Sequence, residues 1–417
     1  MDRIIYWIWL SLSCSPSGST FSKLIKEFED AKDIYLADGK KISSIIGYRN
    51  SDRAALENKS LERAEEIYSF CRKHQVGLLP YYDEKYPDLL RQIDNPPVLL
   101  YYRGKLPDFD KCFTVAAVGT RSLSDYGRKN AFRISYDLAT AGATIVSGMA
   151  IGIDGVAMAG ALLAGGSTVA IIGSGIDICY PEQHLRLARE IVKSGCVMTE
   201  YAPGTRPNKL NFPKRNRIIS GLSRATMVFE GPERSGAMIT ARCAKDQGRA
   251  VYALPASVGE RNSQLTTLLI KNGAKMCTTA EDILNDFTDS YGGIINPFKL
   301  KERISADMMA SLAEYGVVAV CPSDDIFDAP RPRKRTAREE VEHTIEEHKS
   351  EAIAPPPSFD KRALEIYKKI PTEGSCSLES LVDGENNLRQ VMRYLLMLEV
   401  GGFVVLLPGE TVSRKFK

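Results

Sequence analysis

The fold is decided by residues 114–172, which read TVAAVGTRSLSDYGRKNAFRISYDLATAGATIVSGMAIGIDGVAMAGALLAGGSTVAII. Apolar runs rich in alanine and β-branched residues stand at 114–118, 144–147 and 168–172, and two longer segments with helical spacing separate them. Strands that are buried on both faces of a sheet have such continuous apolar sequences, and helical connections between them make neighbouring strands parallel. The stretch therefore predicts an α/β fold built on an extended, Rossmann-like, doubly wound parallel sheet.

The same alternation continues toward the C-terminus and defines a domain over residues 114–290. Short strands that alternate with longer helices are typical of βαβ units. Further strands are expected at 197–200, 226–230 and 250–253. The expected helices lie at 126–141, 154–164, 184–193, 215–220, 237–247 and 264–271.

Different patterns flank this domain. Residues 1–80 show helical spacing and predict a small helical domain, which a connecting arm over 81–113 follows. Residues 291–360 carry a basic run, an acidic run and three consecutive prolines, a composition that predicts a flexible linker. Residues 361–417 predict a winged-helix-like domain with helices at 363–370, 378–381 and 388–399 and a strand at 403–408. The second of these helices carries no Lys or Arg, so a DNA contact and a protein contact both stay open for this domain.

The composition excludes several classes of protein. The net charge of +3 results from 55 Lys and Arg against 52 Asp and Glu, which by itself says nothing about a nucleic-acid partner. Nine cysteines without a C-x-x-C pair, and only four histidines, argue against a disulfide framework, a metal site and a histidine-based triad. No apolar stretch approaches the ~20 residues of a membrane span. We therefore expect a cytoplasmic protein without membrane contact, metal or cofactor.

The loops after the expected strands carry residues suited to an anion. In a doubly wound sheet, ligands bind beyond the carboxyl ends of the strands, where glycines let the backbone approach the ligand and helix N-termini present amide groups. Asp154 is expected to cap the helix that follows the second strand. The residues are Gly119, Thr120 and Arg121 after the first strand, Ser147, Gly148, Gly152 and Asp154 after the second, and Arg234, Ser235 and Gly236 after the fifth.

The segment 211–217, which reads NFPKRNR, is the most informative in the chain. Asn211 is expected to cap a helix with Pro213 in its first turn. One aromatic ring next to three cations and two amides suits a phosphate backbone with a stacked base. In the alternative interpretation, Phe212 packs in the core and the cations pair with carboxylates, but no acidic cluster stands nearby in the sequence. The site residues expected here are Asn211, Phe212, Lys214, Arg215, Asn216 and Arg217.

Taken together, these strings resemble those of the DprA/Smf family, the DNA-processing proteins of bacterial natural transformation. The resemblance covers about residues 80–286 closely, and the order and spacing of the strings make it specific. The matching strings are Gly119-Thr120-Arg121, Ser147-Gly148 with Gly152-Ile153-Asp154, Tyr180-Pro181, residues 211–222, Ser235-Gly236 with Thr240, and Asn272-Gly273-Ala274.

The resemblance implies a protein that is not an enzyme. It implies binding of single-stranded DNA in a basic pocket, protection of incoming DNA, homodimerisation, and help in loading RecA recombinase in transformation and recombination. By motif position, the pocket uses Arg121, Phe212, Lys214, Arg215 and Arg217, with Ser147 and Gly148 near phosphate.

The chain departs from the family pattern at two places in the α/β domain. Met158 stands where the family usually has His, and Leu265-Thr266-Thr267 replaces a Gly-x-Asn string, which puts one rim of the pocket in doubt.

The main alternative function is a nucleotide-processing hydrolase of the Rossmann-like phosphoribohydrolase type. The segment 231–238 argues against it, because it lacks the Gly-Gly pair and the catalytic Glu of those enzymes. A nicotinamide dehydrogenase is excluded because no Gly-x-Gly-x-x-Gly follows the first strand. A pure interaction scaffold is the third alternative.

Overall fold

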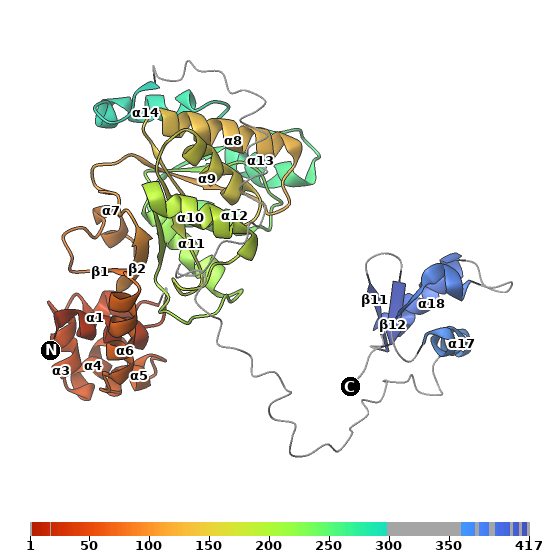
Figure 1. Cartoon of the computed structure of the whole chain (residues 1–417), viewed down its shortest axis with the longest axis horizontal. Helices are drawn as coiled ribbons and strands as arrows, with labels where there is room; N and C mark the ends of the chain where they lie inside the picture. The colour runs from red at the N-terminus through yellow and green to blue at the C-terminus, as the bar shows by residue number, and fades with distance from the viewer. Residues whose placement is uncertain are drawn as a thin grey trace. The chain divides into compact units, whose positions relative to one another are not determined.

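A computed structural model of the chain describes residues 2–16, 18–297, 360–371, 375–382, 388–400, 403–407 and 411–414 (Figure 1). The chain divides into two compact units, Met1–Pro330 and Arg331–Lys417. Each unit is described separately below.

A large mixed sheet organises the first unit. Within the described residues it has nine strands in the order β1-β2-β6-β5-β4-β3-β7-β8-β9. Strands β3 to β9 are parallel to one another, whereas β2 pairs antiparallel with β6 and β1 antiparallel with β2. The predicted Rossmann-like parallel sheet is therefore confirmed. The strands are β1 (Gly77–Pro80), β2 (Leu99–Gly104), β3 (Thr114–Val118), β4 (Thr144–Ser147), β5 (Thr168–Ile171), β6 (Cys196–Thr199), β7 (Ala225–Val228), β8 (Ala250–Ala253) and β9 (Lys275–Met276).

Helices cover both faces of this sheet, because alternate residues of the central strands point to opposite sides. Val115 and Ala117 of β3 pack with the helices over 125–140 and 153–163. Ala116 and Val118 pack with the helices over 211–221 and 236–246 on the other face. The helices of this domain are α7 (Asp88–Arg91), α8 (Asp125–Thr140), α9 (Ile153–Leu163), α10 (Leu185–Ser194), α11 (Asn211–Gly221), α12 (Gly236–Asp246), α13 (Gln264–Lys271) and α14 (Glu281–Tyr291), with 3-10 turns η1 (Glu182–His184) and η2 (Arg261–Ser263).

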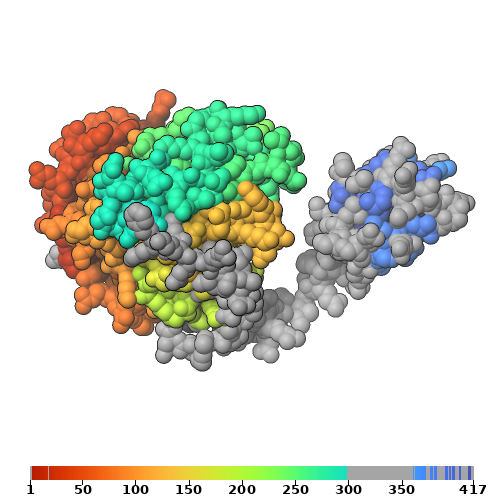
Figure 2. Space-filling view, turned by 90° about the horizontal axis from the view of Figure 1, so that it is seen from above, coloured from red at the N-terminus to blue at the C-terminus, as the bar shows by residue number. Residues whose placement is uncertain are grey.

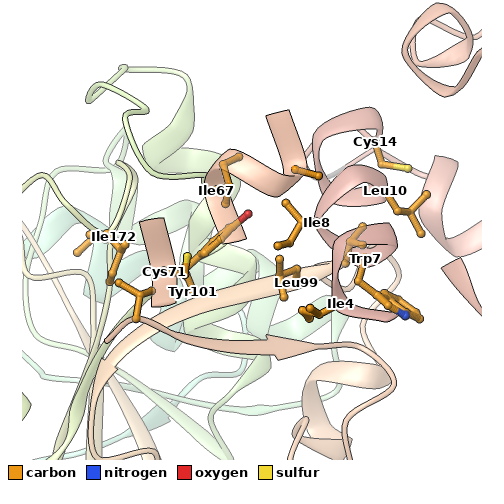
Figure 3. Close-up of a cluster of buried hydrophobic side chains, with 14 of the residues drawn as sticks. Ile4, Trp7, Ile8, Leu10, Cys14, Ile67, Cys71, Leu99, Tyr101 and Ile172 are labelled. Carbon is orange, nitrogen blue, oxygen red and sulfur yellow. The ribbon is translucent and has the colours of Figure 1, made fainter. Parts of the chain in front are cut away.

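Among the described residues, six helices precede the sheet: α1 (Arg3–Ser13), α2 (Thr20–Leu24), α3 (Ala31–Leu36), α4 (Gly39–Ile46), α5 (Arg53–Glu57) and α6 (Glu62–Lys73). Their apolar faces join the core of the sheet. Ile8 and Ile67 lie in one buried cluster with Leu99 and Tyr101 of β2 and with Ile172 (Figure 3). In the space-filling view, the surface of these helices, coloured red, runs into that of the following segments without a break (Figure 2).

Two expectations about the domain edges need correction. The segment 81–113 was interpreted as a connecting arm, but it contributes β2, whose buried Leu99, Leu100 and Tyr101 give it a place in the sheet. Residues 291–297, expected as the beginning of a linker, belong to the domain instead, because Ile295 is 1% exposed and packs in the core beside α8 and α14. Residues 298–359, which make up the rest of the expected linker, lie outside the described residues.

The second unit has its own small core. Its described elements are α17 (Lys361–Lys369), β10 (Ser375–Ser377), η5 (Leu378–Leu381), α18 (Leu388–Val400), β11 (Val404–Leu407) and β12 (Thr411–Arg414). The strands form an antiparallel sheet in the order β10-β12-β11, and Ile366 and Leu395 lie in the core. The expected second helix at 378–381 is a 3-10 turn. The assignment as a winged-helix-like domain stays a prediction. Among the described residues of the whole chain, no helix has the length and apolar character that crossing a membrane requires.

Candidate binding site at the carboxyl edge of the sheet

A small pocket, with a volume of about 40 Å³, lies where the loops after β3, β4 and β5 meet the beginning of α11. This volume is well below the ~300–1,000 Å³ that is typical of small-molecule sites. The lining combines two cations, two aromatic rings and backbone of a glycine-containing loop. The lining residues are Arg121, Gly148, Ala150, Ile151, Tyr180, Pro181, Phe212 and Arg215.

The loop between Gly148 and Gly152 depends on its glycines. Gly152 has a φ of +95°, and a Cβ atom there would lie 2.4 Å from the carbonyl oxygen of Thr120. A Cβ atom on Gly148 would lie 2.3 Å from Nη2 of Arg215. Both positions therefore need glycine, the first for its backbone conformation and the second because a guanidinium group rests on the backbone. Ile151, between them, is 45% exposed at the pocket.

Arg215 places a positive charge at the base of the pocket. Its side chain is buried, with the residue 4% exposed, and it donates through Nη1 to the carbonyl oxygen of Gly148 at 2.9 Å and through Nε to Oδ1 of Asn216 at 3.0 Å. Burial lowers the pKa of Arg215 to about 10, and Asp154 opposes this effect. Arg215 therefore stays protonated at neutral pH, and hydrogen bonds hold its orientation.

Asp154 balances part of that charge. Its carboxylate accepts a hydrogen bond from the backbone N–H of Gly148 at 3.1 Å. Burial raises the pKa of Asp154, and the neighbouring Arg215 limits the rise. The expected role of Asp154 as a helix cap is wrong, because α9 begins at Ile153 with Gly152 in the capping position. The carboxylate instead ties the glycine loop to the helix.

Two aromatic rings and a second cation form the wall of the pocket. The ring centroids of Tyr180 and Phe212 lie 5.5 Å apart with their planes 31° from parallel. The guanidinium carbon of Arg121 lies 5.5 Å from the centroid of Phe212. Phe212 also lies against Gly173, where a Cβ atom would come within 3.0 Å of the ring. Because Arg121 is exposed and Tyr180 is 42% exposed, both are accessible to a ligand from solvent.

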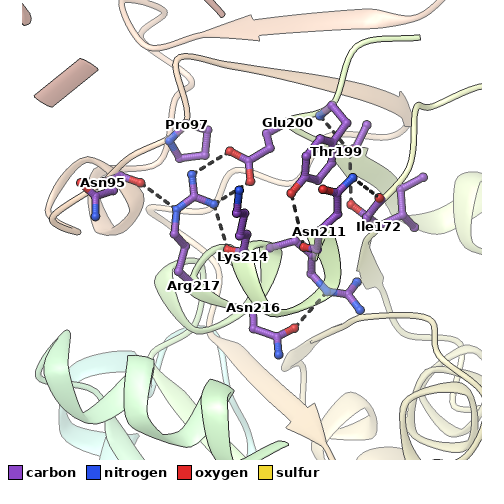
Figure 4. Close-up of polar contacts among 12 residues, drawn as sticks. Asn95, Pro97, Ile172, Thr199, Glu200, Asn211, Lys214, Asn216 and Arg217 are labelled. Carbon is purple, nitrogen blue, oxygen red and sulfur yellow. Dashed lines mark hydrogen bonds and ion pairs between the residues drawn. The ribbon is translucent and has the colours of Figure 1, made fainter. Parts of the chain in front are cut away.

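Arg217, which is expected in the site, does not line this pocket and instead forms an ion pair with Glu200 (Figure 4). Its guanidinium group donates to both carboxylate oxygens of Glu200 at 2.7 Å and to the carbonyl oxygen of Asn95 at 2.9 Å. Burial acts to lower the pKa of Arg217, but Glu200 outweighs it and raises that pKa above its ordinary value. Arg217 therefore pairs with a carboxylate, as the alternative interpretation of the segment 211–217 predicts.

The beginning of α11 also differs from the expectation. Leu210, and not Asn211, occupies the capping position. Oδ1 of Asn208 accepts a hydrogen bond from the N–H of Leu210 at 2.9 Å. Asn211 uses its side-chain amide to donate to the carbonyl oxygen of Gly173 at 3.2 Å (Figure 4). Asn211 thus fixes the beginning of α11 to the loop after β5, which places Phe212 at the pocket.

The other expected residues do not line the pocket. Ser147 is buried and donates to the carbonyl oxygen of Ala117 at 2.6 Å, which turns its hydroxyl group toward β3. Asn216 donates to the carbonyl oxygen of Gly236 at 3.2 Å and so links α11 to the beginning of α12. The residues outside the lining are Gly119, Thr120, Ser147, Gly152, Asp154, Asn211, Lys214, Asn216, Arg217, Arg234, Ser235 and Gly236.

Four lining residues were not among those expected: Ala150, Ile151, Tyr180 and Pro181. The Tyr180-Pro181 string was recognised in the sequence but was not assigned to the site. The altered rim at 265–267 does not reach the pocket lining. Leu265 is buried there, and its N–H donates to the carbonyl oxygen of Gly231 at 3.0 Å.

Comparison with known proteins gives a consistent picture. A protein-family model described as DNA recombination-mediator protein A matches residues 77–288. DNA processing protein DprA of Streptococcus pneumoniae (strain ATCC BAA-255 / R6) is 43% identical over 275 residues, which cover 65% of this chain and 95% of that protein. Protein Smf of Synechocystis sp. is 38% identical over 284 residues, which cover 67% of this chain and 71% of that protein. The X-ray structure of DprA from Streptococcus pneumoniae superposes with a TM-score of 0.59 at 35% identity, covering 69% of this chain and 99% of that chain.

Proposed function

The chain belongs to the DNA recombination-mediator protein A family, DprA/Smf, and from this premise we propose that the pocket lined by Arg121, Tyr180 and Phe212 binds single-stranded DNA. The observation that carries the proposal is the placement of an exposed guanidinium group 5.5 Å from an aromatic ring that a second ring flanks at 5.5 Å. Sites for single-stranded nucleic acid combine cations along the phosphate backbone with rings on which bases stack.

Different residues of the pocket are proposed to contact different parts of the DNA. Phe212 and Tyr180 offer ring surface to an unpaired base, and Arg121 is accessible to the adjacent phosphate. Arg215 adds positive charge at the base, and its hydrogen bond to the carbonyl oxygen of Gly148 fixes its side chain against the glycine loop. A duplex keeps its bases stacked inside the helix, away from such rings. Single strands are therefore preferred.

The hydrogen bonds of the buried Glu230 support binding rather than hydrolysis. Glu230, which follows β7, accepts hydrogen bonds from the N–H and the hydroxyl group of Ser124 at 2.7 Å each. It thereby holds the beginning of α8 and is not directed at a ligand.

We propose that the chain acts without catalytic chemistry, in the cytoplasm and as a homodimer, to protect incoming single-stranded DNA and to help load RecA recombinase onto it.

The proposal is tested by fluorescence anisotropy of a labelled thymidine 20-mer, with unlabelled single-stranded and double-stranded DNA as competitors, over a range of salt concentrations. The single strand should compete better than the duplex. The Arg121→Ala variant should show a salt slope lower by about 1, because one phosphate contact is lost. Lys271→Ala, which removes an exposed cation at the end of α13, is the matched control. Equal competition by both DNA forms, or equal slopes for the two variants, would contradict the assignment.

A further inference from the structure

A second pocket, with a volume of about 360 Å³, lies in the N-terminal helical segment, remote in sequence from the site described above. It is formed by α1, by the segment that follows α2 and by the loop after β1. Its volume falls within the range of ~300–1,000 Å³ that is typical of small-molecule sites. The lining residues are Trp7, Ile25, Lys26, Glu27, Phe28, Glu29, Tyr81, Tyr82 and Arg91.

Four of its nine lining residues are aromatic. The ring of Tyr82 lies 5.2 Å from that of Trp7, and the half-buried rings of Phe28 and Tyr81 also line the pocket. The guanidinium carbon of Arg91 lies 4.9 Å from the ring centroid of Tyr81. Arg91 also donates to the carbonyl oxygens of Tyr81 and of Asp83, so the loop after β1 is held in place. Aromatic rings and arginine planes are the surfaces on which proteins stack unpaired bases.

A second observation concerns the indole nitrogen of Trp7, a residue that lines the pocket. Trp7 is fully buried, and its Nε1–H finds no acceptor among the described residues. Buried indole N–H groups usually have a hydrogen-bond partner. Trp9, on the same helix, follows that rule and donates to the carbonyl oxygen of Asn58 at 2.9 Å. Of the two tryptophans, the one that lines the pocket is therefore the one that lacks an acceptor.

The charges around the pocket define the ligand. Lys26 and Arg91 line it and disfavour a cationic group inside the pocket, whereas Glu27 and Glu29 line it and disfavour a phosphate inside the pocket. A neutral, planar group that has both hydrogen-bond donors and acceptors on its edge satisfies both conditions. An unpaired nucleobase is such a group, and its faces suit the aromatic wall.

We propose that this pocket binds an unpaired base of the same single-stranded DNA, as a second contact separate from the pocket at Arg121. The inference rests on the proposed function, since it takes its ligand from the strand that the chain binds. The base packs among Phe28, Tyr81 and Tyr82, and its edge meets the lysine and carboxylate groups of the rim. The strand thus contacts the helical segment as well as the sheet edge.

The decisive experiment is photo-crosslinking of the full wild-type chain to a 20-mer substituted with 5-iododeoxyuridine at successive positions, followed by mass spectrometry of the crosslinked peptides. We expect crosslinks at Tyr81 or Tyr82 as well as at Tyr180 or Phe212. Crosslinks at Tyr180 or Phe212 without any at Trp7, Phe28, Tyr81 or Tyr82 would overturn the second site and leave the proposed function intact. Absence of crosslinks at Tyr180 and Phe212 would instead contradict the proposed function.

Tryptophan fluorescence gives a second readout, because Trp7 and Trp9 are the only tryptophans of the chain. In a Trp9→Phe variant, saturation with the 20-mer should change the emission of Trp7. The change should shrink at least severalfold in Trp9→Phe/Phe28→Ala, whereas anisotropy of the labelled 20-mer still reports binding through Arg121. An unchanged emission at saturation, or an equal change in both variants, would refute the second site.

Discussion

The Arg217→Ala variant should lower the stability of the protein and leave its affinity for DNA nearly unchanged. Arg217 and Glu200 have side chains only 10% and 5% exposed, and their two hydrogen bonds are 2.7 Å long. In Arg217→Ala, Glu200 stays buried without its cation, which costs about 3–5 kcal/mol when one partner of a buried pair is removed. A loss of about 3 kcal/mol lowers Tm by roughly 6–12 °C in a domain of this size.

Urea unfolding followed by circular dichroism measures the loss, and anisotropy with the labelled 20-mer measures DNA affinity at a temperature where the variant is folded. We expect the midpoint to fall and the dissociation constant to stay within about twofold of wild type, because Arg217 does not line the pocket. The double variant Arg217→Met/Glu200→Leu should lose less stability than Arg217→Ala, since it leaves no unpaired charge. A wild-type midpoint in Arg217→Ala, together with a tenfold weaker affinity, would refute the reasoning.

Two further substitutions test the loop and a buried acid. Gly152→Ala should lose more than about 1 kcal/mol of stability and weaken DNA binding. The reason is that residue 152 has a φ of +95° and that its Cβ atom would lie 2.4 Å from the carbonyl oxygen of Thr120. An unchanged urea midpoint would contradict this prediction. Burial raises the pKa of Asp137 from 3.8 to about 6, so the wild type should lose stability as the pH rises through about 4 to 6. The Asp137→Asn variant should not show this loss of stability. The measurement is the urea midpoint of each protein at pH 4.5 and at pH 7.5. An equal change of the midpoint between the two pH values in wild type and variant would contradict the prediction.

Strand positions were predictable because both faces of the central strands are buried. The segments 114–118 and 144–147 have the same bounds in the structure as in the prediction, since each is a continuous apolar run ending at a glycine-containing loop. Strand β2 was missed as a member of the sheet. Its antiparallel pairing with β6 depends on a contact between segments about 95 residues apart, which no local pattern records.

The site residues that were predicted also stand in local sequence strings, whereas those that were missed depend on contacts between distant segments. Arg121, Phe212 and Arg215 were predicted from local strings and line the pocket. The environment of Arg217 was not predicted, because its partner Glu200 stands after a different strand and only the packing of α11 brings the two together. Tyr180 was not assigned for a similar reason, since the path of the loop after β5 decides whether its ring faces Phe212.

The most direct test of the proposed site is the dissociation constant of the single-stranded 20-mer for the double variant Arg121→Ala/Phe212→Ala. Loss of a stacked base alone is worth about 1–3 kcal/mol, so the combined loss should weaken binding on the order of a hundredfold. The urea midpoint should change little, because Arg121 is exposed and Phe212 is only partly buried. An affinity within twofold of the Lys271→Ala control, in a protein that unfolds at the wild-type midpoint, would contradict the central claim.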